Sequence, residues 1–239
     1  MLINQTPRCF ALVPCAGSGQ RAGPGGPKQY REVAGRTVVG WTLAALQRVA
    51  RIEATLVVLS PQDQAFERLV PGFEGERGWV ARCGGETRAE TVAQGLRELM
   101  ARGAQPHDWV LVHDAARCLL RPEWVDRLID ACCDDEVGGL LALPLADTLK
   151  QSVAAQEGMR VQSTVARDGK WAAQTPQMFR LGLLQPALAH AGAEVTDESG
   201  AVEALGHAPR LVEGVLENFK LTWPQDFDLA QRLLQDRRP

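Results

Sequence analysis

Short runs of apolar residues in the first half of the chain alternate with stretches whose apolar positions follow the helical period. The runs at 10–13, 54–59, 79–82 and 110–112 are typical of short strands buried in a parallel sheet, whereas residues 37–49 have the spacing of a helix. Strand and helix in alternation predict an α/β fold, a doubly wound and mostly parallel sheet with helices in layers on both faces.

Local signals extend this pattern. Thr87 and Glu90 have the spacing of a capping box, which predicts a helix to about Arg102. Pro122 predicts the start of a second helix, which ends near Cys132. The remaining expected elements are a short helix over 61–70, strands at 140–143 and 210–215, core and turn at 171–179, a helix through 205 capped by residues 196–199, and a terminal helix from 222–225.

Residues 147–167 differ from the rest of the chain. They alternate in polarity, contain a polar tip with Gly158 and carry no helical stripe. This pattern predicts a projecting two-stranded β-arm at about 146–168, within a single domain that covers 1–239. A lone hairpin is marginally stable, so we expect the arm to pack on a partner subunit in a homodimer.

Composition narrows the class of protein. The 239 residues are 45% hydrophobic and 23% charged, which is ordinary for a soluble globular domain. A net charge of −3 argues against a general nucleic-acid binder. Six cysteines without a C-x-x-C pair favour reduced thiols in the cytoplasm. Because we find neither a signal peptide nor an apolar run of spanning length, we expect no membrane association.

A glycine-rich loop follows the first strand. Five glycines lie between Gly17 and Gly26, and the loop carries two cations, Arg21 and Lys28. Inward-facing amides and two positive charges suit a polyphosphate. The loop is not a Walker A motif, and residues 17–22 match the dinucleotide fingerprint only loosely, since Ser60 stands where that fingerprint needs an acid. A plain surface turn remains an alternative.

Arg88 stands in the first turn of the helix that begins after Gly84-Gly85-Glu86-Thr87. The helix dipole favours anions at that end, so an arginine gains nothing from it. A ligand phosphate or a neighbouring carboxylate would explain Arg88. A simple helix start is the competing interpretation of the whole segment.

Asp114 follows the apolar strand 110–112, at the end where open α/β sheets place their ligands. A carboxylate there, near a polyphosphate, is the usual way to hold Mg²⁺. His113 is more typical of a packed residue at a strand end than of a catalyst. Arg117 has two interpretations, because it can pair with Asp114 or help to frame a nucleotide.

The segments PCAGSGQRAG, PKQY, GGETR and HDAAR together resemble the signature motifs of the 2-C-methyl-D-erythritol 4-phosphate cytidylyltransferase family. The resemblance implies a three-layer fold like that of the nucleotide-diphospho-sugar transferases and a homodimer formed through the arm. Glu86, Thr91, Cys118 and Glu217 depart from the family pattern, and the last leaves a metal or orienting role at that position in doubt.

The resemblance also implies roles for individual residues. Arg21 and Lys28 would stabilise the charge that develops on the α-phosphate of CTP. Arg167 and Lys220 would hold the incoming phosphate, and Asp114 would bind Mg²⁺. The other expected contacts to the nucleotide or substrate are Ala16, Gly17, Gly19, Gly85, Glu86, Arg88, Thr91, Thr148 and Thr175.

The reaction implied by the resemblance is attack by the phosphate of 2-C-methyl-D-erythritol 4-phosphate on the α-phosphorus of CTP, with loss of pyrophosphate. That phosphate is already ionised at neutral pH, so no general base is needed. The alternatives are a ribitol 5-phosphate cytidylyltransferase, a nicotinamide-dependent dehydrogenase, which the missing ribose acid disfavours, and a catalytically silent nucleotide-binding regulator.

Overall fold

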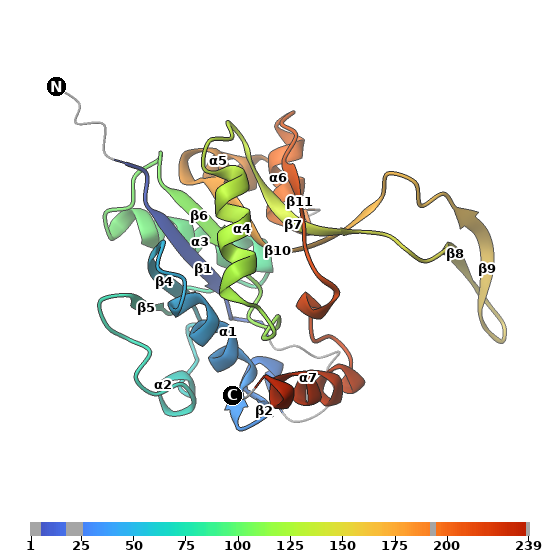
Figure 1. Ribbon diagram of the computed structural model, residues 1–239, viewed down its shortest axis with the longest axis horizontal. Helices are drawn as coiled ribbons and strands as arrows, with labels where there is room; N and C mark the ends of the chain where they lie inside the picture. Colours follow the sequence, from blue (N-terminus) through green and yellow to red (C-terminus); the bar gives the residue numbers. More distant parts are fainter. Residues whose placement is uncertain (1–5, 18–25, 192–194, 238–239) are drawn as a thin grey trace.

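The computed structural model describes residues 6–17, 26–191 and 195–237. A seven-stranded sheet runs through this part of the chain in the order β11-β7-β10-β6-β1-β4-β5 (Figure 1). β10 is antiparallel to both of its neighbours, and the other pairings in this sheet are parallel. Its strands are β1 (Cys9–Pro14), β4 (Ile52–Val58), β5 (Gly78–Ala81), β6 (Trp109–Val112), β7 (Gly138–Pro144), β10 (Trp171–Arg180) and β11 (Arg210–Glu213).

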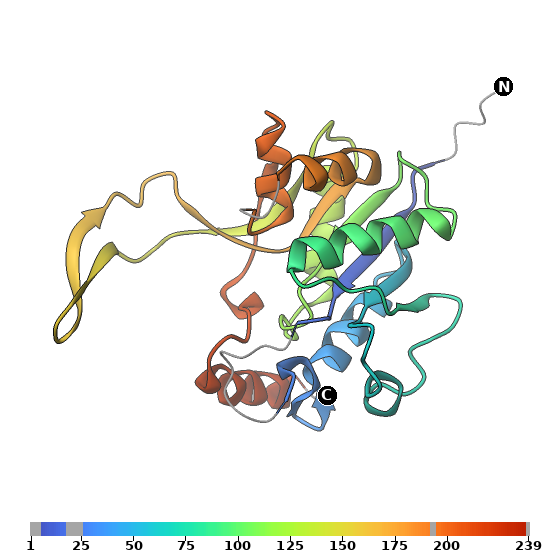
Figure 2. The same ribbon diagram turned by 180° about the vertical axis from the view of Figure 1, so that it is seen from behind.

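Helices cover both faces of this sheet. α1 and α4 lie on one face, whereas α3, α5 and α6 lie on the other (Figures 1 and 2). The three-layer, doubly wound architecture is therefore confirmed. The helices are α1 (Val38–Gln47), α2 (Phe66–Leu69), α3 (Arg88–Ala101), α4 (Pro122–Cys132), α5 (Leu181–Ala191), α6 (Glu198–Ala204) and α7 (Pro224–Asp236), with short 3₁₀ turns η2 (Lys28–Tyr30) and η4 (Leu216–Asn218) and a small hairpin of β2 (Glu32–Val33) and β3 (Arg36–Thr37).

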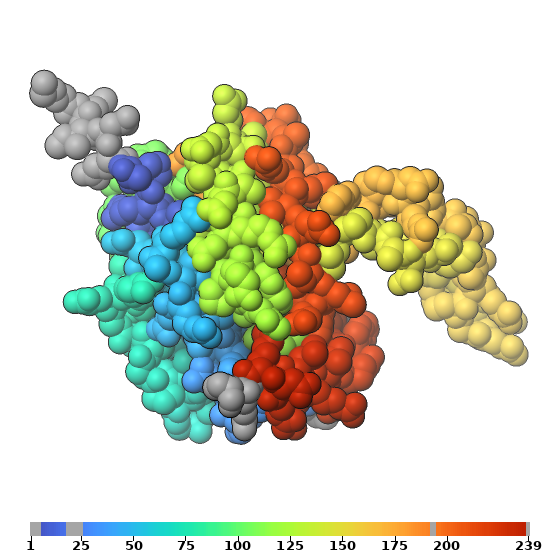
Figure 3. Space-filling model, viewed as in Figure 1, coloured from blue at the N-terminus to red at the C-terminus, as the bar shows by residue number. Residues whose placement is uncertain are grey.

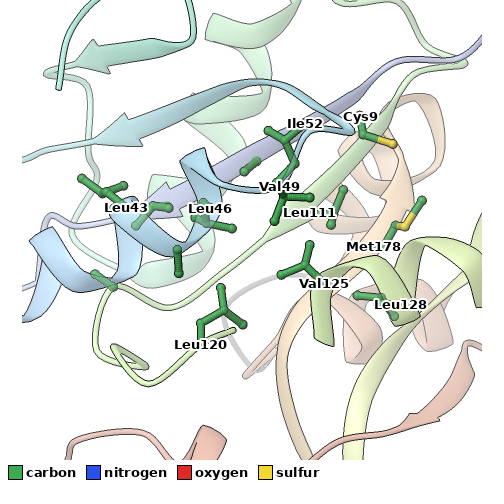
Figure 4. Packing of buried hydrophobic residues seen from close by; sticks show 14 of the residues in the cluster. Cys9, Leu43, Leu46, Val49, Ile52, Leu111, Leu120, Val125, Leu128 and Met178 are labelled. Atoms are coloured by element: carbon green, nitrogen blue, oxygen red, sulfur yellow. The ribbon is translucent and has the colours of Figure 1, made fainter. Parts of the chain in front are cut away.

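The alternation of side chains along β1 divides the core in two. Phe10 and Leu12 pack in the cluster under α3, while Ala11 and Val13 pack in the cluster under α1 and α4. Successive residues of a strand point to opposite faces, and a strand covered on both sides is apolar throughout. Figure 4 shows the second cluster, to which α1 and α4 contribute Leu43, Leu46, Val125 and Leu128.

Most predicted elements are present within a few residues of their expected bounds. The capping box at the start of α3 is formed in both directions by Thr87 and Glu90, and α4 has the predicted bounds. The helix expected over 61–70 is reduced to the single turn α2. None of the helices in the described ranges has both the length and the apolar character needed to cross a membrane.

The segment after the arm was predicted as core and turn: its second half is buried in the core, but the expected turn is wrong. Residues 171–180 instead form β10, which lies between β6 and β7 in the middle of the sheet. The helix that follows it, α5, was not predicted. Pro186 lies inside this helix, and proline there is ordinarily a signal against a helix.

The predicted β-arm is confirmed as a projecting hairpin. β8 (Leu149–Ala155) pairs with β9 (Gly158–Val165) and extends away from the body (Figure 3). Its side chains are almost all exposed, among them Val153 at 46%, Met159 at 65% and Val161 at 63%. The arm is an insertion between β7 and β10, two neighbouring strands of the large sheet, so its base is tied to the centre of the body.

Candidate active site

A cavity of about 190 Å³ lies beyond the carboxyl ends of β1 and β6. Open α/β sheets bind their ligands at this edge. Four segments that are distant in sequence meet there: the loop after β1, the start of α3, the turn after β6 and the segment before α7. The predicted residues that line the cavity are Ala16, Gly17, Lys28, Gly85, Glu86, Arg88, Thr91, Asp114 and Lys220.

The first residues after β1 are held in place by a buried glutamine. Gln29 Nε2 donates to the backbone oxygens of Cys15, at 3.2 Å, and Gly17, at 3.0 Å. The neighbouring Lys28 reaches across the cavity, and its Nζ donates to the Leu221 oxygen at 2.8 Å. Gly19 and Arg21, both predicted site residues, lie outside the described residues.

The opposite wall is the start of α3 and the two glycines before it. A Cβ at Gly84 would lie 2.4 Å from that of Ala16 and 2.7 Å from the Leu59 oxygen, so the close approach of these two loops requires glycine. Glu90 Oε2 accepts from the amide of Glu86 at 2.9 Å. The helix cap thus also fixes the edge of the cavity.

Asp114 is the electrostatic centre of the site. Its side chain is 8% exposed, and three cations surround it: Arg88 Nε at 2.9 Å, Lys220 Nζ at 2.9 Å and Arg117 Nε at 3.5 Å. Burial raises the pKa of Asp114, but the attraction of Arg88, Lys220 and Arg117 outweighs it and holds that pKa far below its usual range. Asp114 is therefore an anion at neutral pH.

Of the two explanations offered for Arg88, a ligand phosphate or a neighbouring carboxylate, the structure shows the second. Besides Asp114, Arg88 binds Glu198 through two parallel bonds, Nη1 to Oε1 at 2.7 Å and Nη2 to Oε2 at 3.0 Å. Burial disfavours the charged form of Arg88, but Glu198 and Asp114 raise its pKa above the usual value. Sequence reasoning missed Glu198, whose only visible signal was a place in the cap of a predicted helix.

Thr175 from β10 lies behind Asp114. Its hydroxyl accepts from the Asp114 amide at 3.0 Å and lies 3.1 Å from His113 Nδ1. Together with Asp114, Arg117 and Lys220 it lines a second hollow of about 240 Å³ next to the first. His113 is fully buried, and its Nε2 lies 3.3 Å from the Arg117 oxygen, as expected of a packed strand-end histidine.

Arg117 pairs with Asp114, which was the first of its two interpretations, and its proposed part in framing a nucleotide stays a prediction. It stands beside Asp114, and its Nη1 donates to the Asn218 oxygen at 2.6 Å. Asn218 in turn donates to the Thr175 oxygen at 2.8 Å. These bonds link the turn after β6, the middle of β10 and η4 into one rigid wall, and Asn218 is a second residue that sequence reasoning missed.

Two of the predicted residues that the structure describes reach neither hollow within the chain. Thr148 and Arg167 lie at the base of the arm, where the Arg167 guanidinium donates to the Ala146 oxygen. Neither lines either of the two hollows. Glu217, whose role was in doubt, accepts from Arg121 at 3.1 Å and from Arg237.

Comparison with known proteins agrees with this geometry. The family model described as "IspD: 2-C-methyl-D-erythritol 4-phosphate cytidylyltransferase" matches residues 9–236. The enzyme of that name from Paraburkholderia phymatum is 51% identical, over 96% of this chain and 97% of its own length. A "Bifunctional enzyme IspD/IspF" from Albidiferax ferrireducens is 57% identical over 98% of this chain, which spans 54% of that relative.

Solved structures show the same likeness. A crystal structure of 4-diphosphocytidyl-2C-methyl-D-erythritol synthase aligns with a TM-score of 0.84 at 42% identity, and covers 97% of this chain and 100% of its own. The 2-C-methyl-D-erythritol 4-phosphate cytidylyltransferase from Thermus thermophilus aligns with a TM-score of 0.75 at 34% identity, over 95% of this chain and 99% of its own.

The buried His113 should make stability depend on pH. Burial lowers its pKa to about 4, against about 6.5 in an unfolded chain. As pH falls from about 6.5 to about 4, the unfolded chain takes up a proton that the folded one does not, so the free energy of unfolding falls by about 3 kcal/mol through this residue. Urea unfolding at pH 7 and pH 5 measures the larger part of this fall.

His113→Asn should reduce this pH dependence, because the variant lacks the titrating ring. His190→Asn, at an exposed position near the end of α5, is the matched control and should follow the wild type. An unchanged difference between pH 7 and pH 5 in the His113 variant would contradict the assignment.

Proposed function

The chain belongs to the 2-C-methyl-D-erythritol 4-phosphate cytidylyltransferase family, and on that basis we propose that it transfers CMP from CTP to 2-C-methyl-D-erythritol 4-phosphate and releases pyrophosphate. The observation that carries the proposal is the convergence of Gly17, Lys28, Arg88, Asp114 and Lys220 on one cavity, in a chain that matches the family over almost its whole length. The product would be 4-diphosphocytidyl-2-C-methyl-D-erythritol, an intermediate of the non-mevalonate isoprenoid pathway.

The chemistry of the cavity suits a nucleophile that belongs to the substrate. Cys15 lines it, but burial raises the pKa of this thiol well above its usual value, so it stays protonated. His113 is buried and bonded away from the cavity. A substrate phosphate is ionised at neutral pH and needs no base, so positioning and charge stabilisation can supply the catalysis.

The cations would then divide into two groups by role. Lys28, with Arg21 from the same loop, would stabilise the charge that develops on the α-phosphate of CTP. Lys220, with Arg117 nearby, would face the phosphate of the acceptor. Ala16, Gly17, Gly19, Gly85, Glu86, Thr91 and Arg88 would frame the nucleotide, and Thr175 would lie behind the acceptor phosphate.

Asp114 fits a role toward Mg²⁺. Each carboxylate oxygen can accept about two bonds, so Asp114 keeps acceptor capacity beside its cations. The described residues contain no group of three His, Cys, Asp or Glu side chains that could hold a metal ion. Mg²⁺ is commonly bound by one or two carboxylates and substrate phosphates, so Asp114 would hold an ion that arrives with CTP. When bound, Mg²⁺ would neutralise charge on the leaving pyrophosphate.

We also propose a homodimer in which the arm of one subunit completes the site of the other. Exposed apolar side chains stand on both faces of the arm, Met159 and Val161 on one face and Val153 on the other, and a partner would cover them. Thr148 and Arg167 do not line the hollows of their own chain, so they are available to a neighbour's site. The proposed location is the cytoplasm, where the six free cysteines would stay reduced.

Pyrophosphate release measures the proposed activity directly. Each of CTP, UTP, ATP and GTP would be combined with 2-C-methyl-D-erythritol 4-phosphate or with ribitol 5-phosphate, in the presence of Mg²⁺. We expect rapid release only with CTP and methylerythritol phosphate. A preference for ribitol 5-phosphate would move the protein to the sister activity, and no release with any pair would support a silent nucleotide-binding protein.

Metal dependence tests Asp114. Asp114→Asn keeps the shape of the side chain but removes its charge, so it should raise the Mg²⁺ concentration that gives half-maximal rate. Glu123→Gln, at an exposed position in the first turn of α4, is a control that should leave this concentration unchanged. An unaltered Mg²⁺ dependence in the Asp114 variant would leave that residue as the structural partner of its three cations.

Mixed dimers test the shared site. Lys28→Ala damages the body and Arg167→Ala damages the arm, so each homodimer should be inactive. If Arg167 acts across the interface, every mixed dimer has one intact site, and random mixing should restore roughly a quarter of the wild-type activity. If subunit exchange is confirmed but no activity returns, Arg167 acts within its own chain.

A further inference from the structure

One buried carboxylate at the site has no part in the function proposed above. Glu198 is the first residue of α6, and its side chain is completely buried. Both of its oxygens accept from the guanidinium of Arg88, at 2.7 and 3.0 Å. Taking such a pair out of water costs free energy that the attraction between the charges only roughly offsets, so stability alone is a weak reason for it.

The geometry of arginine explains what this pair can do. A guanidinium is planar and carries its N–H donors in a rigid fork. Glu198 occupies the edge that carries Nη1 and Nη2, which leaves the Nε–H of Arg88 directed at Asp114 Oδ1, 2.9 Å away. The two parallel bonds to Glu198 therefore fix the orientation in which Arg88 meets Asp114.

The contact continues into the cavity. The other oxygen of Asp114, Oδ2, lies 2.9 Å from Lys220 Nζ. Glu198, Arg88, Asp114 and Lys220 thus form a chain of alternating charges, which runs from α6 through the start of α3 and the end of β6 to the segment before α7. Of these four residues, Glu198 alone does not line the cavity.

We propose that Glu198 is a positioning residue for the transfer reaction. It holds Arg88 against Asp114, and through Asp114 it fixes Lys220 where the acceptor phosphate would bind. It also balances the charge of Arg88, whose other partner, Asp114, is shared with Lys220 and Arg117. The assignment of the acceptor phosphate to Lys220 rests on the proposed function; the chain of ion pairs does not.

Glu198→Gln tests this role, because it keeps the shape but removes the charge and one of the two acceptors. We expect kcat/KM for the acceptor phosphate to fall by on the order of 10- to 100-fold, the loss typical of a small displacement of a reacting group. The matched control is Glu203→Gln on the same helix, where Glu203 is exposed and accepts from the Ser199 hydroxyl. That variant should retain wild-type kinetics.

A double-mutant cycle shows whether Glu198 acts through Arg88. If it does, adding Glu198→Gln to Arg88→Gln should cost less than about 3-fold more, because the residues act as one unit. Fully multiplicative losses would overturn the proposal. The proposal would also be overturned if the loss of activity in Glu198→Gln were fully accounted for by the fraction of that variant that is unfolded.

The side-chain NMR signal of Arg88 gives a readout that needs no turnover. The Nε–H resonance, assigned by its absence in Arg88→Lys, should exchange slowly with water in the wild type and at least about tenfold faster in Glu198→Gln. Glu203→Gln should not change it. Should Glu198→Gln fail to fold, Glu198→Asp, which keeps the charge on a shorter side chain, replaces it and should give an intermediate exchange rate.

The two readouts separate failure of this inference from failure of the proposed function. A wild-type protein that releases no pyrophosphate contradicts the proposed function, and the exchange rate of Arg88 then decides by itself whether Glu198 positions it. An active wild type in which Glu198→Gln changes neither the exchange rate nor kcat/KM overturns the positioning role.

Discussion

The buried negative charge of Asp114 is the constraint on which the site depends. A carboxylate that is 8% exposed must be paired, because an isolated charge in the interior is far too costly. Its partners come from three separate parts of the chain: the start of α3, the turn after β6 and the segment before α7. The need to satisfy one charge therefore holds the walls of the cavity together, and it leaves cations facing the space between them.

The order of the strands turns this local requirement into an extended site. Parallel strands end at a common edge, so the loops after β1 and β6 meet without a special connection. The antiparallel β10 adds a residue from within a strand, Thr175, which contacts both Asp114 and His113. Because the arm is inserted between β7 and β10, the strand that supports Asp114 also leads out to the arm.

The site offers charged groups that can stabilise a reaction electrostatically, rather than a nucleophile of the protein. Cys15 and His113, the groups at the site that are most reactive in other enzymes, are buried, and burial keeps the thiol protonated and lowers the pKa of the imidazole to about 4. Among the described residues, the charged side chains that line the cavity are Lys28, Arg88 and Lys220, together with the carboxylates of Glu86 and Asp114. Such a site suits a reaction whose nucleophile and leaving group are both phosphates.

The sequence by itself determined the features that depend on neighbouring residues. Each of these features depends on residues that are close together in the sequence. They are the apolar runs of the parallel strands, the capping box of Thr87 and Glu90 and the polar tip of the arm. The glycines at 84 and 85 and the carboxylate after β6 were likewise recognisable, because each follows a strand at the edge where ligands bind. The unfavourable place of Arg88 in the helix dipole correctly signalled an anionic partner.

Only the tertiary structure decided which anion that is. Glu198 lies 110 residues from Arg88, and a contact over that separation leaves no periodic trace in the sequence. The position of β10 in the sheet was likewise decided by the tertiary structure. Pro176 argues against a central strand, because proline has no N–H to donate to a neighbouring strand. The pairing of β10 with β7 is irregular between Ala173 and Gln177, and this irregularity accommodates the proline. Local patterns specify elements, whereas the pairing of buried charges and the choice of neighbouring strands are settled by the whole fold, because there each polar group must find its partner.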